Sequence, residues 1–269
     1  MTLKEMIACA DETLEYFIKV MPDVPFTKDD IVIEIFASHK KMVERVKAFC
    51  AEHIPDKILT AGQVKDLEIN VLANALTGRK KSAVIMKANY VLPAYEFRTI
   101  IFHELMHIYC NKLEMPEDKH FIDIYGSGTT PTSDVSAEDG FLCSGYKIWS
   151  EFIAQYFALK MTLTKPYTVD QEGHYIEYLL SGVNINNRLH SKENLSMSCA
   201  CFLTCSDADD EVELFKKIYD GDIPPKQRAF LTCLFQFHNQ IKKEKPYEID
   251  EDYIAQLGSN YTVLLALNK

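Results

Sequence analysis

The stretch Phe102-His103-Glu104-Leu105-Met106-His107-Ile108-Tyr109 decides how the rest of the chain is interpreted, because it contains the pattern His-Glu-x-x-His. Apolar residues recur around it at helical spacing, and no Gly or Pro interrupts residues 94–113, so we predict a helix there. Positions i and i+4 share one face of a helix. His103 and His107 can therefore direct their imidazoles to one point, and Zn²⁺ accepts imidazole nitrogen well.

Glu104 follows His103 directly and is rotated away from the direction of the metal. It is placed to reach a zinc-bound water rather than the zinc, which is the arrangement of a metal-assisted hydrolase with a general base. The pattern also arises by chance, in roughly one or two chains per hundred of this length. Here it lies in a strongly apolar segment, where unpaired polar groups are costly, and this context favours a metal site.

Composition limits the class of protein. The 269 residues are 47% hydrophobic and 25% charged, which are globular values. A net charge of −10 argues against binding to nucleic acid or an anionic membrane, since both need a basic surface. We see no run of transmembrane length and no secretory signal at the N-terminus. The cysteines mostly lie in apolar contexts, and the spacing of Cys199, Cys201 and Cys205 does not match a zinc site, so we expect reduced cysteines and a cytoplasmic protein.

The periodicity predicts an α+β fold that is mostly helical, with a small N-terminal sheet that has an edge strand beside the His-Glu-x-x-His helix. The strand over 82–91 could be that edge, along which an extended peptide would add, or an ordinary structural strand. We expect a zincin-like core over 1–165 and a helical region over 166–269 packed on it. The predicted helices are 2–21, 38–53 with Ser38 as N-cap, 94–113, 146–163, 173–180, 185–203, 212–219, 226–242 and 248–267; the strands are 31–36 and 82–91; 67–76 is ambiguous and 114–145 is a long polar loop.

A catalytic zinc needs a third protein ligand. The extended metzincin pattern would require Gly at 110 and His at 113, but the chain has Cys110 and Leu113. Glu151 is the better candidate, because it is an isolated carboxylate in an apolar helix with small residues at i+3 and i+7. The alternative for Glu151 is an ion pair with a Lys or Arg. Weaker rivals for the third ligand lie in the loop before it: His120, Asp123, Asp134 and Asp139.

The order strand, His-Glu-x-x-His helix, loop and Glu-x-x-Ala helix resembles the gluzincin metallopeptidases, and within them is most similar to the ImmA/IrrE-type peptidases. The resemblance rests on residues 85–89, 97–107 and 151–158 and covers about residues 82–163. It implies a zinc peptidase with His103, His107 and Glu151 as ligands and Glu104 as base. Gln155 stands where larger gluzincins often carry Asp, and no DNA-binding segment is evident.

The sequence thus predicts a zinc-dependent metallopeptidase that hydrolyses peptide bonds in a peptide or protein substrate. It leaves the oligomeric state and the natural target open. The donor that would stabilise the oxyanion is not assigned, although His174, Tyr175 and Tyr178 are chemically suitable. Two alternatives are a binding protein that keeps the metal without turnover and a scaffold whose C-terminal helices bind a partner.

Overall fold

The computed structural model describes residues 1–55, 59, 61–69, 72–113, 137–162 and 251–267, together with the single positions 216, 225, 228 and 232. The chain divides into two compact units. One comprises Met1–Asp134 with Met161–Thr164, and the other comprises Val135–Lys160 with Lys165–Lys269. The two units are described separately below.

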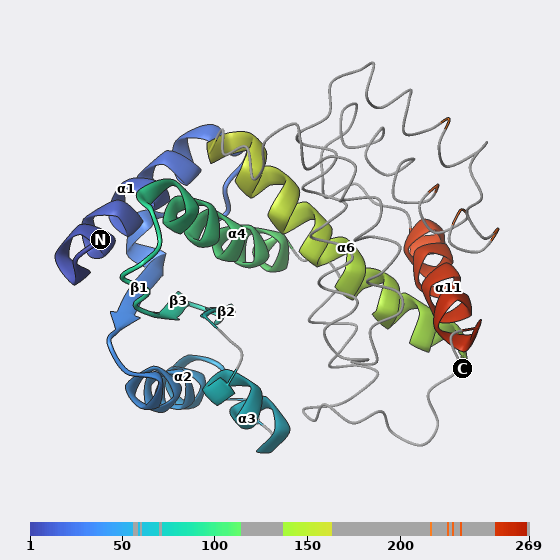
Figure 1. The fold of residues 1–269 in the computed structure, drawn as a ribbon, viewed down its shortest axis with the longest axis horizontal. Coiled ribbons are helices and arrows are strands. Elements are labelled where there is room, and N and C mark those ends of the chain that lie inside the picture. The colour runs from blue at the N-terminus through green and yellow to red at the C-terminus, as the bar shows by residue number, and fades with distance from the viewer. Residues whose placement is uncertain are drawn as a thin grey trace. The chain divides into compact units, whose positions relative to one another are not determined.

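The first unit is built on a three-stranded mixed sheet (Figure 1). Strand β1 is Ile31–Phe36, β2 is Ala73–Leu76 and β3 is Ser82–Lys87, in the spatial order β1-β3-β2. β1 runs parallel to β3, with Ile31 opposite Ser82, whereas β2 runs antiparallel to β3. Parallel strands need a crossover connection, and the chain between β1 and β3 supplies one that includes two helices.

The strand predicted over 82–91 forms, but it ends at Lys87 and lies in the centre of the sheet. It therefore pairs on both sides, so that, of the two possibilities left open for this segment, an edge strand or an ordinary structural strand, the second is the one observed. Its run of five consecutive buried residues is typical of a strand that is covered on both faces. Among the described residues, β2 takes the edge position, and helix α4 (Ala94–Lys112) contacts it.

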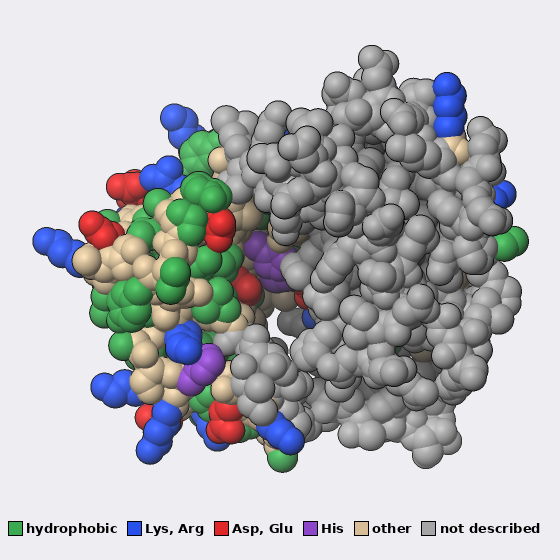
Figure 2. Space-filling view, viewed as in Figure 1, with side chains coloured by type: hydrophobic (Ala, Val, Ile, Leu, Met, Phe, Trp, Pro, Cys, Tyr) green, Lys and Arg blue, Asp and Glu red, His purple; other side chains and the backbone are tan. Residues whose placement is uncertain are grey.

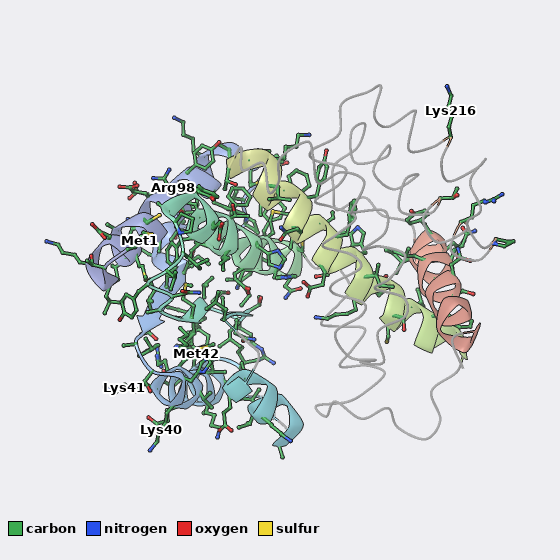
Figure 3. The ribbon with its side chains drawn as sticks, viewed as in Figure 1. Met1, Lys40, Lys41, Met42, Arg98 and Lys216 are labelled. Carbon is green, nitrogen blue, oxygen red and sulfur yellow. The ribbon has the colours of Figure 1, made fainter. Side chains whose placement is uncertain are left out.

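One face of the sheet is covered by α2 (His39–His53), against which α3 (Ala61–Ile69) packs. Apolar residues of α2 meet side chains of β2 and β3 in a continuous core, and Met42, marked in Figure 3, is fully buried in it. Ser38 stands at the N-cap of α2, but its side chain makes no capping hydrogen bond. The buried members of this core are Met42, Val43, Val46, Phe49, Cys50, Leu67, Leu76, Ala83 and Ile85.

Helices α1 (Leu3–Val20) and α4 lie on the other face of the sheet (Figure 1). Aromatic rings join them: the centroid of Phe17 lies 4.7 Å from that of Phe102 and 5.9 Å from that of Tyr109. Burial of such rings contributes much of the hydrophobic stabilisation of a small core. At the rim, Arg98 of α4, labelled in Figure 3, donates to the Glu12 carboxylate of α1 over 3.1 Å.

The second unit is described through α6 (Ala137–Thr162) and α11 (Glu251–Leu267). These helices pack closely where each carries a glycine. A Cβ on Gly145 of α6 would run into the backbone carbonyl of Ile254, and a Cβ on Gly258 of α11 would run into that of Phe141. Only the absence of a side chain lets the two backbones approach so closely. The last turn of α6 belongs to the first unit, where the carbonyl of Met161 accepts a hydrogen bond from the Tyr16 hydroxyl over 3.0 Å.

The predicted fold class is confirmed: the protein is mostly helical, with a small sheet in its N-terminal part. The second long helix begins at Ala137, so the end of the predicted polar loop is wrong, because residues 137–145 are helical. The predicted helices between 173 and 242, and the remainder of the loop, lie outside the described residues. The predicted boundary at residue 165 stays a prediction. In the part of the chain that the structure describes, no helix is long and apolar enough to cross a membrane.

Candidate metal centre

Helix α4 carries the His-Glu-x-x-His pattern, and its C-terminal end is tied to the turn between β2 and β3. The Lys112 ammonium donates to the carbonyl of Gly78 over 2.7 Å and to that of Arg79 over 3.1 Å. The Asn111 side-chain amide donates to the Thr77 hydroxyl over 3.2 Å. These bonds satisfy polar groups beside the helix terminus and fix α4 on the sheet. The helix therefore presents its histidines from a rigid element.

The polar residues of the pattern are the less buried positions of residues 101–110 in α4, whose other members are buried. Phe102, Leu105 and Met106 are fully buried, whereas His103 and His107 are half-buried. Burial of the apolar neighbours stabilises the helix, and the two imidazoles gain nothing comparable from burial. Half-buried histidines at the surface of a dense core are accessible to a small ligand such as a metal ion.

The two histidines converge as their spacing predicts. Nε2 of His103 lies 3.1 Å from Nε2 of His107, and the ring planes meet at 76°. Two nitrogens that each lie about 2.05 Å from a tetrahedral zinc are separated by about 3.3 Å. The observed separation of the nitrogens is therefore already close to what a shared metal requires. A metal would need both Nε2 atoms unprotonated, with the remaining proton of each ring on Nδ1.

Glu104 is half-buried on the same helix. Within the described residues, it is not a member of the group of side chains that could hold a metal ion, although it is adjacent to His103 in sequence. One residue along a helix is a rotation of about 100°, so its carboxylate leaves the helix in a different direction from the imidazoles. This placement fits the predicted role beside a metal rather than on it.

Glu151 lies on α6 and is 9% exposed. Of the buried residues that the structure describes, it is the only charged one; the other buried polar side chains are Thr13, Ser82, Thr99 and Ser150. Its neighbours at i+3 and i+7, Ala154 and Ala158, are also buried, as predicted for a closely packed helix face. A carboxylate in such surroundings needs a cation as its partner.

One partner is Lys147, whose ammonium lies 3.1 Å from Oε1 of Glu151. The alternative considered for Glu151, an ion pair, is thus present. Glu151 nevertheless also belongs to the group of side chains that could hold a metal ion. The i, i+4 spacing of Lys147 and Glu151 is a signal from which the sequence alone could have predicted this pair.

His103, His107 and Glu151 form a group that could hold a metal ion. Each offers one ligand atom, and these atoms all lie within 4.8 Å of one another. The predicted set of three ligands is therefore brought together, although which metal would bind is not determined by this geometry. Three rivals for the third ligand lie outside the described residues: His120, Asp123 and Asp134. The fourth, Asp139, lies in the first turn of α6. The oxyanion candidates also lie outside the described residues: His174, Tyr175 and Tyr178.

The chain was compared with family models, curated proteins and solved structures. None of them matches it. The resemblance to gluzincins consequently rests on the residues alone, and the function is inferred from the chemistry of the site.

Proposed function

We propose that the protein is a zinc-dependent peptidase, in which His103, His107 and Glu151 hold the metal and Glu104 is the general base. The observation that carries this proposal is the 3.1 Å separation of the two Nε2 atoms on a helix held rigidly against the sheet. A set of two imidazoles and one carboxylate is the ligand set of His₂Glu hydrolytic zinc sites. Such a set leaves a coordination position for water.

When bound, zinc would lower the pKa of a water molecule and polarise the scissile carbonyl. The side chains of this chain divide the remaining tasks. Glu104 accepts the proton of the attacking water and returns it to the leaving amine, which needs a carboxylate near the metal but not on it. His103, His107 and Glu151 orient the site. The substrate would be a peptide or protein segment. We propose a cytoplasmic protein, because the described cysteines are buried in the core, which suits reduced core cysteines: Cys9, Cys50, Cys110 and Cys143.

The first test separates metal binding from turnover. We expect the purified chain to bind one zinc per molecule, and Glu104→Gln to keep the zinc and the fold but to lose hydrolysis of a peptide library by a factor on the order of 10²–10⁴. The substitution is nearly isosteric and removes only the proton acceptor. Metal analysis and mass spectrometry of the peptide products measure the two properties.

Glu151→Gln is the companion variant, because a neutral amide is a poorer ligand than a carboxylate. It should lose both zinc and activity. If Glu104→Gln cleaves as fast as the wild type, Glu104 is not the base. If the wild type binds zinc tightly but cleaves no peptide, the peptidase assignment is wrong and the protein is a metal-containing binding protein.

A further inference from the structure

Strand β1 forms one edge of the three-stranded sheet, opposite the edge that β2 forms (Figure 1). The N–H of Ala88 donates to the carbonyl of Phe36 over 2.8 Å, so Phe36 directs its backbone groups toward β3. The N–H and C=O of one residue in a strand point to the same side, and successive residues alternate. Alternate residues of β1 therefore direct their backbone groups outward: Ile31, Ile33 and Ile35.

The outward backbone groups of Ile33 and Ile35 are available for pairing. The N–H of Ile31 donates to the carbonyl of Lys28 at the start of the edge. In the described part of the chain, the N–H and C=O groups of Ile33 and Ile35 have no hydrogen-bond partner. An extended segment can add to such an edge by backbone pairing.

Strand β1 also lacks the features that usually protect an edge strand. Proteins shorten such strands, or place Lys or Pro in them. β1 has six residues, Ile-Val-Ile-Glu-Ile-Phe, with neither Lys nor Pro, whereas β2 has only four. Figure 2 shows hydrophobic side chains gathered over the part of the first unit where Figure 1 draws β1 and the start of α1. An apolar edge of this length is suited to an extended partner.

The charged residue of β1 indicates the chemistry of that partner. Glu34 accepts a hydrogen bond from Nε of Arg45 on α2 over 2.5 Å, and the same guanidinium lies 3.4 Å from Glu52. This cluster has two carboxylates for one guanidinium, so it carries a negative charge while His53, 3.6 Å from Glu52, is neutral. On an added strand, the residue opposite Glu34 would have its Cβ about 5 Å from that of Glu34, and a basic side chain is favoured there.

A second copy of this chain fits the edge less well. Antiparallel pairing of two β1 strands that uses every outward group of Ile33 and Ile35 sets Ile33 of one copy opposite Ile35 of the other. Glu34 then lies opposite Glu34 of the second copy, and like charges directly opposite each other are destabilising. Glu34 therefore disfavours self-association and favours a partner of different sequence.

We propose that the outer edge of β1 is a docking site for an extended segment of another protein. The segment pairs antiparallel with Ile33 and Ile35 and carries a basic residue, flanked by apolar residues, opposite Glu34. Antiparallel pairs are slightly more stable per residue than parallel ones. The docking site goes beyond the proposed peptidase and is independent of it, because α4, which carries the histidines, contacts the sheet at β2 and β3.

The probe is the synthetic peptide acetyl-Ser-Thr-Val-Lys-Val-Thr-Ser-amide, titrated into the full-length chain. In the proposed register, its two Val residues exchange hydrogen bonds with Ile33 and Ile35, and its Lys lies opposite Glu34. N-methylation of one Val should weaken binding about tenfold or more, because it removes a backbone donor and adds bulk at the interface. N-methylation of the Lys backbone nitrogen is the matched control and should leave binding unchanged, since that N–H points away from β1. Equal binding of the two methylated peptides overturns the inference, as does no binding of the unmodified one.

Amide hydrogen exchange, measured by NMR, locates the peptide on the sheet. In the free protein, the N–H groups of Ile33 and Ile35 should exchange faster than those of Glu34 and Phe36, which face β3. The peptide should slow exchange at Ile33 and Ile35. Slow exchange at both residues before the peptide is added would show that the edge is already covered, and it overturns the inference. Exchange that the peptide does not change has the same consequence.

Replacement of the peptide Lys by Glu tests the charge preference. The Glu peptide should bind the wild type roughly two- to tenfold more weakly, and Glu34→Gln should remove this preference. Glu44→Gln is the matched control, because it removes the same charge from an exposed position on α2 and should keep the preference. Circular dichroism and the midpoint of thermal unfolding show whether each variant is folded. Equal binding of the Lys and Glu peptides to the wild type overturns the basic partner.

Removal of metal with a chelator separates this inference from the proposed function. Peptide binding should be unchanged by the chelator, because the edge of β1 contains no residue of the metal group. Binding that requires metal would place the peptide at the metal centre and overturn the docking site. A wild type that binds the peptide at β1 but hydrolyses no peptide overturns only the peptidase function.

Discussion

Helices α1 and α4 are of similar length and pack against each other, yet they are built in different ways. In α1, the capping box of Thr2 and Glu5 closes the N-terminus, and acidic side chains face water. In α4, the N-cap position is Pro93 and carries no side-chain capping bond, and nine residues of the helix are buried. His103, Glu104 and His107 of α4 lie within its buried stretch, whereas the polar residues of α1 lie mostly on its exposed side.

The comparison distinguishes residues that stabilise a helix from residues that we propose serve a function. The N-terminal cap of α1 follows local rules of helix formation, and the buried Thr13 hydroxyl donates to the carbonyl of Cys9 on the same helix over 2.6 Å. In α4, tertiary packing holds the helix, while His103 and His107 direct their Nε2 atoms at each other. Residues that break a local rule mark the places where a chain is used for something besides folding. The predictions below test that division.

The largest expected effect is on metal binding. His107→Ala should lower zinc affinity by more than the roughly 10–100-fold that is typical for the loss of an outer-sphere partner, because the proposed site would lose a direct ligand. Stability of the metal-free protein should change little, since the imidazole is only half-buried. The control on α1 is Thr13→Ala, which should lose about 1 kcal/mol with its hydrogen bond and bind zinc normally. Zinc titration measures the affinity, and urea unfolding measures the stability. Full zinc occupancy in a variant with both His103→Ala and His107→Ala would contradict the site.

Phe102→Ala, one residue before the first histidine, should have the opposite effect: its main consequence should be a loss of stability rather than of zinc binding. Its ring is fully buried against Phe17, so the substitution should destabilise the fold by about 3–5 kcal/mol. Tyr95 of the same helix is 54% exposed, and Tyr95→Ala should change the free energy of unfolding by less than about 0.5 kcal/mol. Urea unfolding of the two variants provides the comparison. Equal losses would show that α4 is not held by its packing against α1.

The smallest effect concerns the cap of α1 and depends on pH. The backbone N–H of Thr2 donates to the Glu5 carboxylate, and this bond, with that to the Thr2 hydroxyl, lowers the pKa of Glu5 below its ordinary 4.5. A lowered pKa in the folded state contributes stability above the unfolded pKa, which is lost as the pH falls through the folded pKa. Glu5→Gln should therefore lower the melting temperature slightly at pH 7 and make no difference well below pH 4.5. A difference that persists at low pH would point to another cause.

The local spacing of residues in the sequence was sufficient to predict many of the helices and strands of this protein. The helices α1, α2 and α4 and the strand β1 follow from apolar periodicity and from Pro breaks, because these signals act within one element. The convergence of His103 and His107 follows from the same principle, since four residues make about one helical turn. Lys147 and Glu151 are also four residues apart on one helix, so their ion pair could have been predicted from the sequence.

Strand order and the distance of Glu151 from the two histidines needed the tertiary structure. The residues of β3 predict a strand by themselves, but its central place in the sheet depends on β2, which pairs with its second edge. Glu151 is 44 positions from His107 in the chain, and no local periodicity brings a carboxylate within 4.8 Å of two imidazoles over that separation. Within one helix or strand, backbone geometry sets the distances between side chains. Between elements, those distances come from packing, which every other residue of the core helps to determine.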